Sequence, residues 1–295
     1  MMPHSPAVEP SVSSSSAPPV LRRVVIGCGG DERSRDAVRL GTALARAAGA
    51  ELHLVLVVKA DDPFTIPYPP VGSIDGIIAE QAAGWLGEAE TLVDEDVEVH
   101  SSIRGGASVA EGLIAAVEEL AADLLVTGSG VGAGGVTTHP AVEALLHSAP
   151  VPLALAPRGW RDEGGLTEVI AAVSEQHAAH QVADDAAAWA GQLDAGLAHV
   201  TFSSDPAARQ SSSSGPQEEG VRRIVAAGRT LGRAVRDVDW PSGGVLMIGS
   251  SPLARRRRLF LGATAARILT HLPIPMIVMP RRDAETPTSP AGSTR

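Results

Sequence analysis

Short apolar runs alternate with longer amphipathic stretches along most of the chain. The run RRVVIGCGG ends in glycines, and after it Ala37, Leu40, Leu44 and Ala47 recur at helical spacing before Gly49. A short β-branched run predicts a buried strand, whereas apolar residues three and four positions apart predict a helix. This segment is therefore predicted to be a strand followed by a helix.

The same alternation continues to about residue 158. Ser108 and Glu111 form a capping-box signal, which predicts that a helix starts at about Val109. Strands that are apolar from end to end and alternate with helices predict a doubly wound α/β domain, with a parallel sheet covered on both faces. Four further strands are expected at ELHLVLVV, VEVHSSI, DLLVTGSG and VPLALAP.

The pattern starts again after RGWRDEGG, but its middle part is shorter. Between the second and fourth strands the first half has a helix, a strand and a helix, whereas here only a Ser-rich loop and one helix, VRRIVAAGRTLGRAV, are expected. The other expected helices are HQVADDAAAWAGQLDA and ATAARILTHL. The expected strands are TEVIAAVS, LAHVTF, GVLMIGSS and IPMIVMP.

The ends of the two halves match each other. HPAVEALLHSAPVPLALAPR and GATAARILTHLPIPMIVMPRR share a helix of small and apolar residues and a P-x-P entry into a strand that ends in Pro-Arg, which indicates an internal repeat. We therefore predict two tandem α/β domains, joined by a short polar linker and flanked by two Ser/Pro-rich tails that lack the apolar residues to order themselves. The predicted tails are 1–20 and 283–295, the domains are 21–158 and 166–282, and the linker is 159–165.

Composition and charge narrow the classes of function. The 295 residues carry 34 Asp and Glu against 24 Lys and Arg, a net charge of −10, which disfavours a nucleic-acid partner. The one cysteine, Cys28, excludes an intramolecular disulfide, and no apolar stretch has the length of a membrane helix. The start lacks the pattern of a signal peptide, so a cytoplasmic location is expected. Lys59, the single lysine, follows no glycine-rich turn, which excludes a P-loop.

Glycines and serines gather after the first and fourth predicted strands of the first half and after the fourth of the second. In an open parallel sheet, ligands bind beyond the carboxyl ends of the strands, where the strand order reverses. Glycine turns there let backbone amides approach a phosphate, or they simply make tight turns from strand to helix, and both interpretations stay open. The candidates are Gly27, Gly29, Gly30, Gly128, Ser129, Gly130, Gly249, Ser250 and Ser251.

Three segments resemble the universal stress protein family in its tandem two-domain form: RRVVIGCGGDERSRDAVRLGTALARAAGAELHLVLVV, EELAADLLVTGSG and GATAARILTHLPIPMIVMPRR. The resemblance spans roughly 21–158 and 166–282 and implies the α/β fold and a stress-related regulatory role. It also implies that VPLALAP pairs with IPMIVMP across a pseudo-twofold axis, so that one chain mimics a dimer. A homodimer of such chains is a further expectation.

ATP-binding members of this family have an aspartate after the first strand and a G-2X-G-9X-G(S/T) motif after the fourth. The resemblance puts the aspartate position on Gly29 in the first half and on Ser174 in the second. In the first half the motif begins at Gly128, but its loop is two residues short and the expected Gly-Ser/Thr pair reads His139-Pro140. The first half therefore departs from the nucleotide-binding pattern at both ends.

The second half keeps the motif spacing from Gly249 to Gly262. Pro252 replaces the middle glycine and Ala263 the hydroxyl residue, for which Thr264 is a partial substitute. A hydrogen bond contributes about 1 kcal/mol and a tenfold change in affinity is about 1.4 kcal/mol, so two or three losses weaken binding roughly 30-fold to 1000-fold. We expect weak or absent binding of ATP or another adenine nucleotide.

This motif loop also contains a run of four arginines, Arg255, Arg256, Arg257 and Arg258. Four adjacent guanidinium groups beside a glycine turn are candidates for holding a phosphate or another small anion, although basic runs are usually solvated surface. The leading prediction is a stress-related regulatory protein that senses a nucleotide or anion weakly and changes the behaviour of a protein partner. The alternative is a scaffold for protein partners that binds no nucleotide. Slow ATP hydrolysis lacks an evident base, so no enzyme activity is expected.

Other signals are weaker. The motif GVGAGG follows the wrong strand for a dinucleotide fold. His177 and His180 have a spacing that permits a metal pair, but solvent-facing helix residues are the simpler interpretation. Ser211–Ser214 are candidates for phosphorylation. Cys28 is interpreted as a packed small apolar residue rather than a redox sensor.

Overall fold

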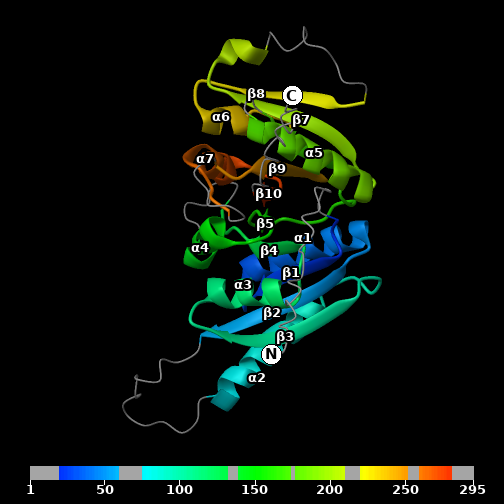
Figure 1. Cartoon of the computed structure of the whole chain (residues 1–295), viewed down its shortest axis with the longest axis vertical. Coiled ribbons are helices and arrows are strands. Elements are labelled where there is room, and N and C mark those ends of the chain that lie inside the picture. Colours follow the sequence, from blue (N-terminus) through cyan, green and yellow to red (C-terminus); the bar gives the residue numbers. More distant parts are fainter. Residues whose placement is uncertain are drawn as a thin grey trace, which may run out of the picture.

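The computed structural model describes residues 20–59, 75–131, 139–173, 177–209, 220–251 and 259–280. These residues form one ten-stranded sheet with the strand order β3-β2-β1-β4-β5-β10-β9-β6-β7-β8 (Figure 1). The order 3-2-1-4-5 of the first half is mirrored by 8-7-6-9-10 in the second half. The predicted α/β fold class is confirmed.

The helices alternate with the strands in both halves. The first half consists of β1 (Arg23–Cys28), α1 (Glu32–Ala48), β2 (Glu51–Lys59), α2 (Asp75–Glu90), β3 (Val99–Gly106), α3 (Val109–Glu119), β4 (Leu124–Gly128), α4 (Pro140–Ser148) and β5 (Leu153–Ala156). The second half consists of β6 (Glu168–Ala172), α5 (His177–Gln192), β7 (Gly196–Ser203), the 3-10 helix η1 (Pro206–Arg209), β8 (Arg222–Ala227), α6 (Leu231–Arg236), β9 (Gly244–Gly249), α7 (Ala263–His271) and β10 (Met276–Met279).

The two halves join through their last strands. β5 and β10 pair antiparallel, with Met276 opposite Leu155 and Val278 opposite Leu153. All other neighbouring strands of the described sheet pair parallel. The expected pairing of VPLALAP with IPMIVMP is therefore present, and it joins the two halves into one continuous sheet.

The core consists of two apolar layers, one on each face of the sheet. One layer contains residues of α1, α2 and α5, such as Leu44 and Trp189, and the other contains residues of α3, α4, α6 and α7, such as Leu145 and Ile268. Because both faces are covered, successive strand residues are buried, which explains the continuous apolar runs. Each layer includes residues of both halves, so the domain boundaries at 21–158 and 166–282 stay a prediction.

The expected helix signals are found at the ends of α1 and α3. Gly49 ends α1 in the left-handed conformation at φ 64°, where glycine has no steric cost. The hydroxyl of Ser108 accepts a hydrogen bond from the backbone amide of Glu111 at 3.2 Å, and α3 begins at Val109 as predicted.

The segment VRRIVAAGRTLGRAV is not one helix, and this prediction was wrong. It forms the edge strand β8 and the short helix α6, which begins after Thr230. Gly228 disfavours a continuous helix, while Ile224 and Ala226 are buried at the alternating spacing of a strand. The second half therefore keeps its third strand. What it lacks, among the described residues, is a helix between β7 and β8 to match α2, and only η1 lies there.

The predicted polar linker is packed against the body of the protein. Trp160 is only 7% exposed and belongs to the apolar layer of α1 and α5. Nearby, the side-chain amide of Gln192 in α5 accepts from the Leu21 amide at 2.9 Å and donates to the Leu21 carbonyl at 2.7 Å. These contacts hold the start of β1 against the second half. The predicted disordered tails lie almost entirely outside the described residues.

Candidate functional site

The predicted glycine clusters meet at the carboxyl edge of the sheet. β1 and β4 are parallel neighbours, with Ile26 opposite Val126, and the strand order reverses between them. Gly27, Gly29 and Gly128–Gly130 therefore follow adjacent strands, and we call this group the first strand-end site. In the second half β9 lies beside β6, so Gly249 and Ser250 occupy the corresponding place, the second strand-end site.

Close packing accounts for the glycines of the first strand-end site. A Cβ atom on Gly128 would lie 2.1 Å from the carbonyl oxygen of Arg33, so the first turn of α1 lies directly on the end of β4. A Cβ atom on Gly27 would lie 2.8 Å from the Leu113 side chain. Gly29 lies near the Ser34 hydroxyl, and Gly130 turns at φ 69°. These contacts support the tight-turn interpretation of the glycines.

The two site serines bind their own loops. Ser129 is completely buried (0% exposed), and its hydroxyl donates toward the carbonyls of Val131 and Ala156, each at 2.9 Å, and accepts from the Val131 amide at 3.2 Å. Ser250 is 3% exposed, and its hydroxyl accepts from the Phe260 amide at 2.7 Å. Both hydroxyls are thus engaged within the protein.

The start of α7 is the most open part of the second strand-end site. Gly262 is the N-cap of α7 and offers no side-chain hydrogen bond to the first turn, and Thr264 in that turn is exposed. Amides of an uncapped first turn can bind an anion. The described part of this site therefore keeps one feature that suits a phosphate.

The candidate anion-binding run lies wholly outside the described residues, which stop at Ser251 and resume at Leu259. Its four members are Arg255, Arg256, Arg257 and Arg258. Pro252 and Ser174 lie outside the described part of the chain as well. The expected role of the arginine run in holding an anion therefore stays a prediction.

Comparison with known proteins agrees with this architecture. The model of the Universal stress protein family matches residues 21–157. The universal stress protein Rv2319c of Mycobacterium tuberculosis is 26% identical over 304 residues, which cover 87% of this chain and 99% of that protein. Residues 21–157 are therefore similar to the universal stress protein family, and the similarity to a universal stress protein extends over most of the chain.

Solved universal stress proteins share the fold along most of the chain. The crystal structure of a universal stress protein from Archaeoglobus fulgidus has a TM-score of 0.65 at 15% identity and covers 88% of this chain and 98% of its own. A putative universal stress protein from Pseudomonas aeruginosa has a TM-score of 0.55 at 17% identity, covering 88% of this chain and 93% of its own. The fold therefore extends over both halves.

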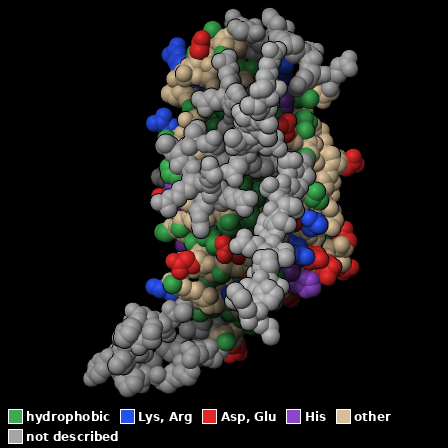
Figure 2. Space-filling model, viewed as in Figure 1, with side chains coloured by type: hydrophobic (Ala, Val, Ile, Leu, Met, Phe, Trp, Pro, Cys, Tyr) green, Lys and Arg blue, Asp and Glu red, His purple; other side chains and the backbone are tan. Residues whose placement is uncertain are grey.

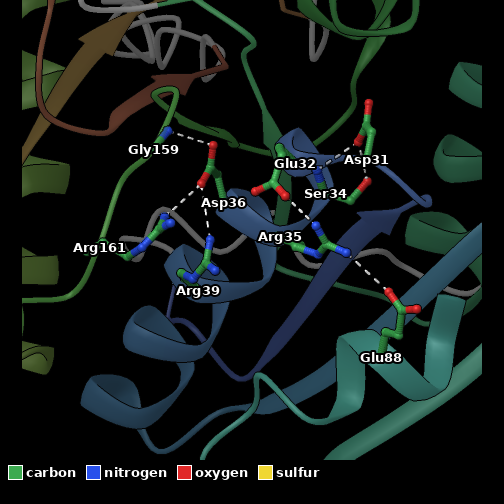
Figure 3. Close-up of polar contacts among 9 residues, drawn as sticks. All are labelled: Asp31, Glu32, Ser34, Arg35, Asp36, Arg39, Glu88, Gly159 and Arg161. Atoms are coloured by element: carbon green, nitrogen blue, oxygen red, sulfur yellow. Dashed lines mark hydrogen bonds and ion pairs between the residues drawn. The ribbon is translucent and has the colours of Figure 1, made fainter.

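Asp31, two residues after the position that the resemblance assigns to the adenine-side aspartate, caps the start of α1. Its carboxylate accepts from the Ser34 amide at 3.0 Å and the Ser34 hydroxyl at 2.9 Å (Figure 3). It also accepts from the Arg33 guanidinium at 2.7 Å. Burial alone would raise the pKa of Asp31, but these bonds from Ser34 and Arg33 lower it below its usual value. The carboxylate is charged and engaged in starting the helix.

Sequence reasoning missed Asp36, the most buried carboxylate of the residues that the structure describes. It is 2% exposed, and it accepts hydrogen bonds from the Gly159 amide at 2.8 Å and from Arg39 and Arg161, each at 3.2 Å (Figure 3). The cluster joins α1 to the linker. A signal existed in the sequence, because Asp36 lies four and eight residues before Leu40 and Leu44, on the apolar stripe where an isolated charge is costly.

Several weaker expectations can also be placed. Burial raises the pKa of the Cys28 thiol to about 12, with a smaller opposing effect of the Val55 backbone, which suits a packed and unreactive residue. The side chains of His177 and His180, most of GVGAGG and Ser211–Ser214 lie outside the described part. Among the residues that are described, no group of three or more His, Cys, Asp and Glu could hold a metal ion.

The described surface offers no wide basic area on the face in Figure 2, where Arg side chains are interspersed with Asp and Glu. Binding to a nucleic-acid backbone requires a basic patch or stripe. The expectation that the protein has no nucleic-acid partner stays a prediction. Within the described ranges, no helix combines the length and apolarity needed to cross a bilayer.

Proposed function

We propose that the chain is a regulatory protein whose two strand-end sites bind an adenine nucleotide or another small anion only weakly. The observation that carries this proposal is the burial of Ser129, whose hydroxyl is fully engaged with Val131 and Ala156. A ligand phosphate at the first strand-end site could therefore not bind this hydroxyl. Regulation then depends on how ligand state changes the contacts with a protein partner, and not on catalysis.

The second strand-end site is where residual binding is expected. It keeps the motif spacing, and the first turn of α7 has no side-chain cap at Gly262. Ala263, however, stands where the motif has a hydroxyl residue. A helix start without that hydroxyl attracts a phosphate through its amides and dipole but gives up one ligand hydrogen bond.

Equilibrium dialysis with ATP, together with thermal unfolding, tests the proposal. A ligand at 100 times its dissociation constant stabilises a protein by about 2.7 kcal/mol. We expect no resolvable shift in Tm until ATP approaches about 1 mM, and a dissociation constant in the micromolar range would contradict weak binding.

Substitution of the motif position identifies the site. Ala263→Ser restores the hydroxyl on an exposed first-turn residue and should tighten ATP binding about fivefold, the equivalent of one hydrogen bond. The matched control is Ala266→Ser, because Ala266 is also exposed on α7 but lies one turn further on. If both substitutions had equal effects, or if Ala263→Ser had no effect on ATP binding, the start of α7 would not be part of the binding site.

Trp85 reports separately on the first strand-end site. Its indole lies against Gly30, where a Cβ atom would be 2.3 Å from the ring, and it is 36% exposed. The other three tryptophans, Trp160, Trp189 and Trp240, are at most 9% exposed. Quenching of tryptophan fluorescence by ATP, if lost in Trp85→Phe, would indicate binding at the first site, whereas we expect no such quenching.

A scaffold that binds protein partners and no nucleotide is the second candidate. The close packing of Gly128 on Arg33 favours it, because it leaves the end of β4 covered by α1. Absence of ATP binding in both the wild type and Ala263→Ser would favour the scaffold, and any ATP-dependent shift in Tm would favour sensing.

A further inference from the structure

In the described part of the second half, one face of β7 and β8 has no covering helix that corresponds to α2. In the first half α2 covers the corresponding face of β2, where Ala82 and Leu86 share an apolar layer with Leu54 and Leu56. Between β7 and β8 the described chain contains only η1. A sheet face without a covering helix must either be covered by another part of the protein or carry polar side chains.

Strand register shows that this face has become polar. In the first half Ile26 lies opposite Leu54, and in the second half Ala171 lies opposite His199. Ile26 and Ala171 belong to the same apolar layer and hold matching places in β1 and β6. Counting along β2 and β7 from these pairs, His199, Thr201 and Ser203 stand where the first half has Leu54, Leu56 and Val58.

A cavity of about 550 Å³ occupies this place. It is lined by Thr201, Ser203, Arg223 and Val225 from the strands, by Val173 just after β6, and by Ala207 from η1. Its volume falls within the range of roughly 300 to 1000 Å³ that is usual for small-molecule sites. The missing helix has therefore left a hollow of ligand size with a mixed polar and apolar lining.

The cationic group of this lining is available to a ligand. The Arg223 guanidinium forms no ion pair or hydrogen bond with any other residue of the described chain, although 34 acidic residues compete for 24 basic ones in the sequence. The acidic residue of the lining, Asp205, is committed to the turn, because its carboxylate accepts from the Ala207 amide at 2.9 Å. The Ser203 hydroxyl accepts from the Asp205 amide at 3.0 Å and donates to no other residue of the described chain.

We propose that this cavity binds a small organic anion, a carboxylate or a phosphate monoester on a compact carbon skeleton. The charged group pairs with the Arg223 guanidinium and accepts from the hydroxyls of Thr201 and Ser203, while the skeleton lies against Val173 and Val225. The proposal uses none of the glycines or serines of the two strand-end sites and does not depend on the proposed nucleotide binding.

Binding is tested on the full chain by backbone amide chemical shifts in NMR, with three probes of similar shape. Benzoate and phenyl phosphate carry the two kinds of anion, and benzyl alcohol is the uncharged control. For probes of this size we expect dissociation constants of about 1 mM, with shifts centred on residues 199–208 and 222–226. Tighter binding of phenyl phosphate than of benzoate would assign the phosphate monoester, and the reverse order would assign the carboxylate.

Two substitutions decide whether the cavity is responsible. Arg223→Gln should weaken both anions at least about tenfold, because a charge-assisted contact is lost. Arg229→Gln is the matched control, an exposed arginine just beyond the same strand, and should leave both affinities unchanged. Thr201→Leu puts a leucine at the position that corresponds to Leu56 of the first half. The larger side chain should fill the cavity and abolish binding of all probes.

Two results would overturn the proposal. One is equal weakening by Arg223→Gln and Arg229→Gln, which would mean unspecific attraction to positive charge. The other is the absence of shifts around β7 and β8 at several times the expected dissociation constant. The first result is read from the arginine variants and the second from the wild type, so neither depends on whether Thr201→Leu folds.

Discussion

The carboxylate of Asp36 accepts a hydrogen bond from the backbone amide of Gly159, 123 residues away, at 2.8 Å. This bond fixes the linker against α1 at the point where the chain leaves β5 and moves to the second half (Figure 3). Because Arg39 and Arg161 bond the same carboxylate, one side chain on α1 positions three groups. The junction of the two halves therefore depends on a polar contact as well as on the β5–β10 pairing.

Asp36→Ala should lower the free energy of unfolding by about 2–3 kcal/mol, since it removes the buried carboxylate that accepts hydrogen bonds from Gly159, Arg39 and Arg161. Asp36→Asn should lower it less, because the side-chain amide oxygen still accepts from Gly159. Urea unfolding followed by circular dichroism measures both. Asp96→Ala, at an exposed turn, serves as control and should stay within about 0.5 kcal/mol of wild type.

Gly128→Ala should destabilise the protein by about 3 kcal/mol, because the new methyl group would overlap the Arg33 backbone. Gly105→Ala is the matched control: Gly105 is also a strand glycine, but no heavy atom lies within 4 Å of its Cβ position. Thermal unfolding of both variants checks this. A mild effect of Gly128→Ala would show that α1 is not packed on β4. The end of β4 would then again be a candidate for ligand binding.

Cys28 should react slowly with thiol reagents in the folded protein. Burial raises the pKa of its thiol from 9.0 to about 12, so the reactive thiolate is scarce at pH 8. Labelling with a disulfide reagent should be on the order of 100- to 1000-fold slower than in urea. Rapid labelling of the native protein would instead support a redox-sensing cysteine.

Local sequence patterns predicted most of the fold because helices cover both faces along most of the sheet. Runs such as RRVVIGCGG are apolar throughout, and Gly49 and Ser108 mark helix ends through their own backbone and side-chain chemistry. The pattern failed at VRRIVAAGRTLGRAV because Ile224, Leu231 and Val235 suit helical spacing, while the pairing of β8 with β7 is a long-range contact that no local spacing reveals.

The candidate site was less predictable for a related reason. Glycines at the strand ends were expected from the sequence, but whether they face a ligand or a neighbouring backbone depends on where α1 packs, as the contact of Gly128 with Arg33 shows. The polar face of β7 could not be recognised as a site from the sequence. Thr201 and Ser203 line a cavity only because η1 and β8 lie beside them in the fold.

Stability should decrease below about pH 6.5 through His53. His53 on β2 lies opposite His100 on β3, and their rings stack with centroids 5.1 Å apart. The pKa of His53 is lowered first by burial and next by the charge of His100, with Arg23 adding to the effect and Glu51 opposing it. An unfolded histidine binds its proton near pH 6.5, so below that pH the unfolded chain takes up more protons.

The contribution of His53 is therefore fully present above about pH 6.5 and is lost as the pH falls toward the lower pKa of the folded state. His53→Gln should show a smaller drop in urea midpoint between about pH 7.5 and 5.5 than the wild type. His100→Gln should also reduce the drop, because it removes the neighbouring charge while leaving the burial of His53. A titration of the His53 ring by NMR measures the pKa directly, and a value at or above that of an exposed histidine would contradict the mechanism.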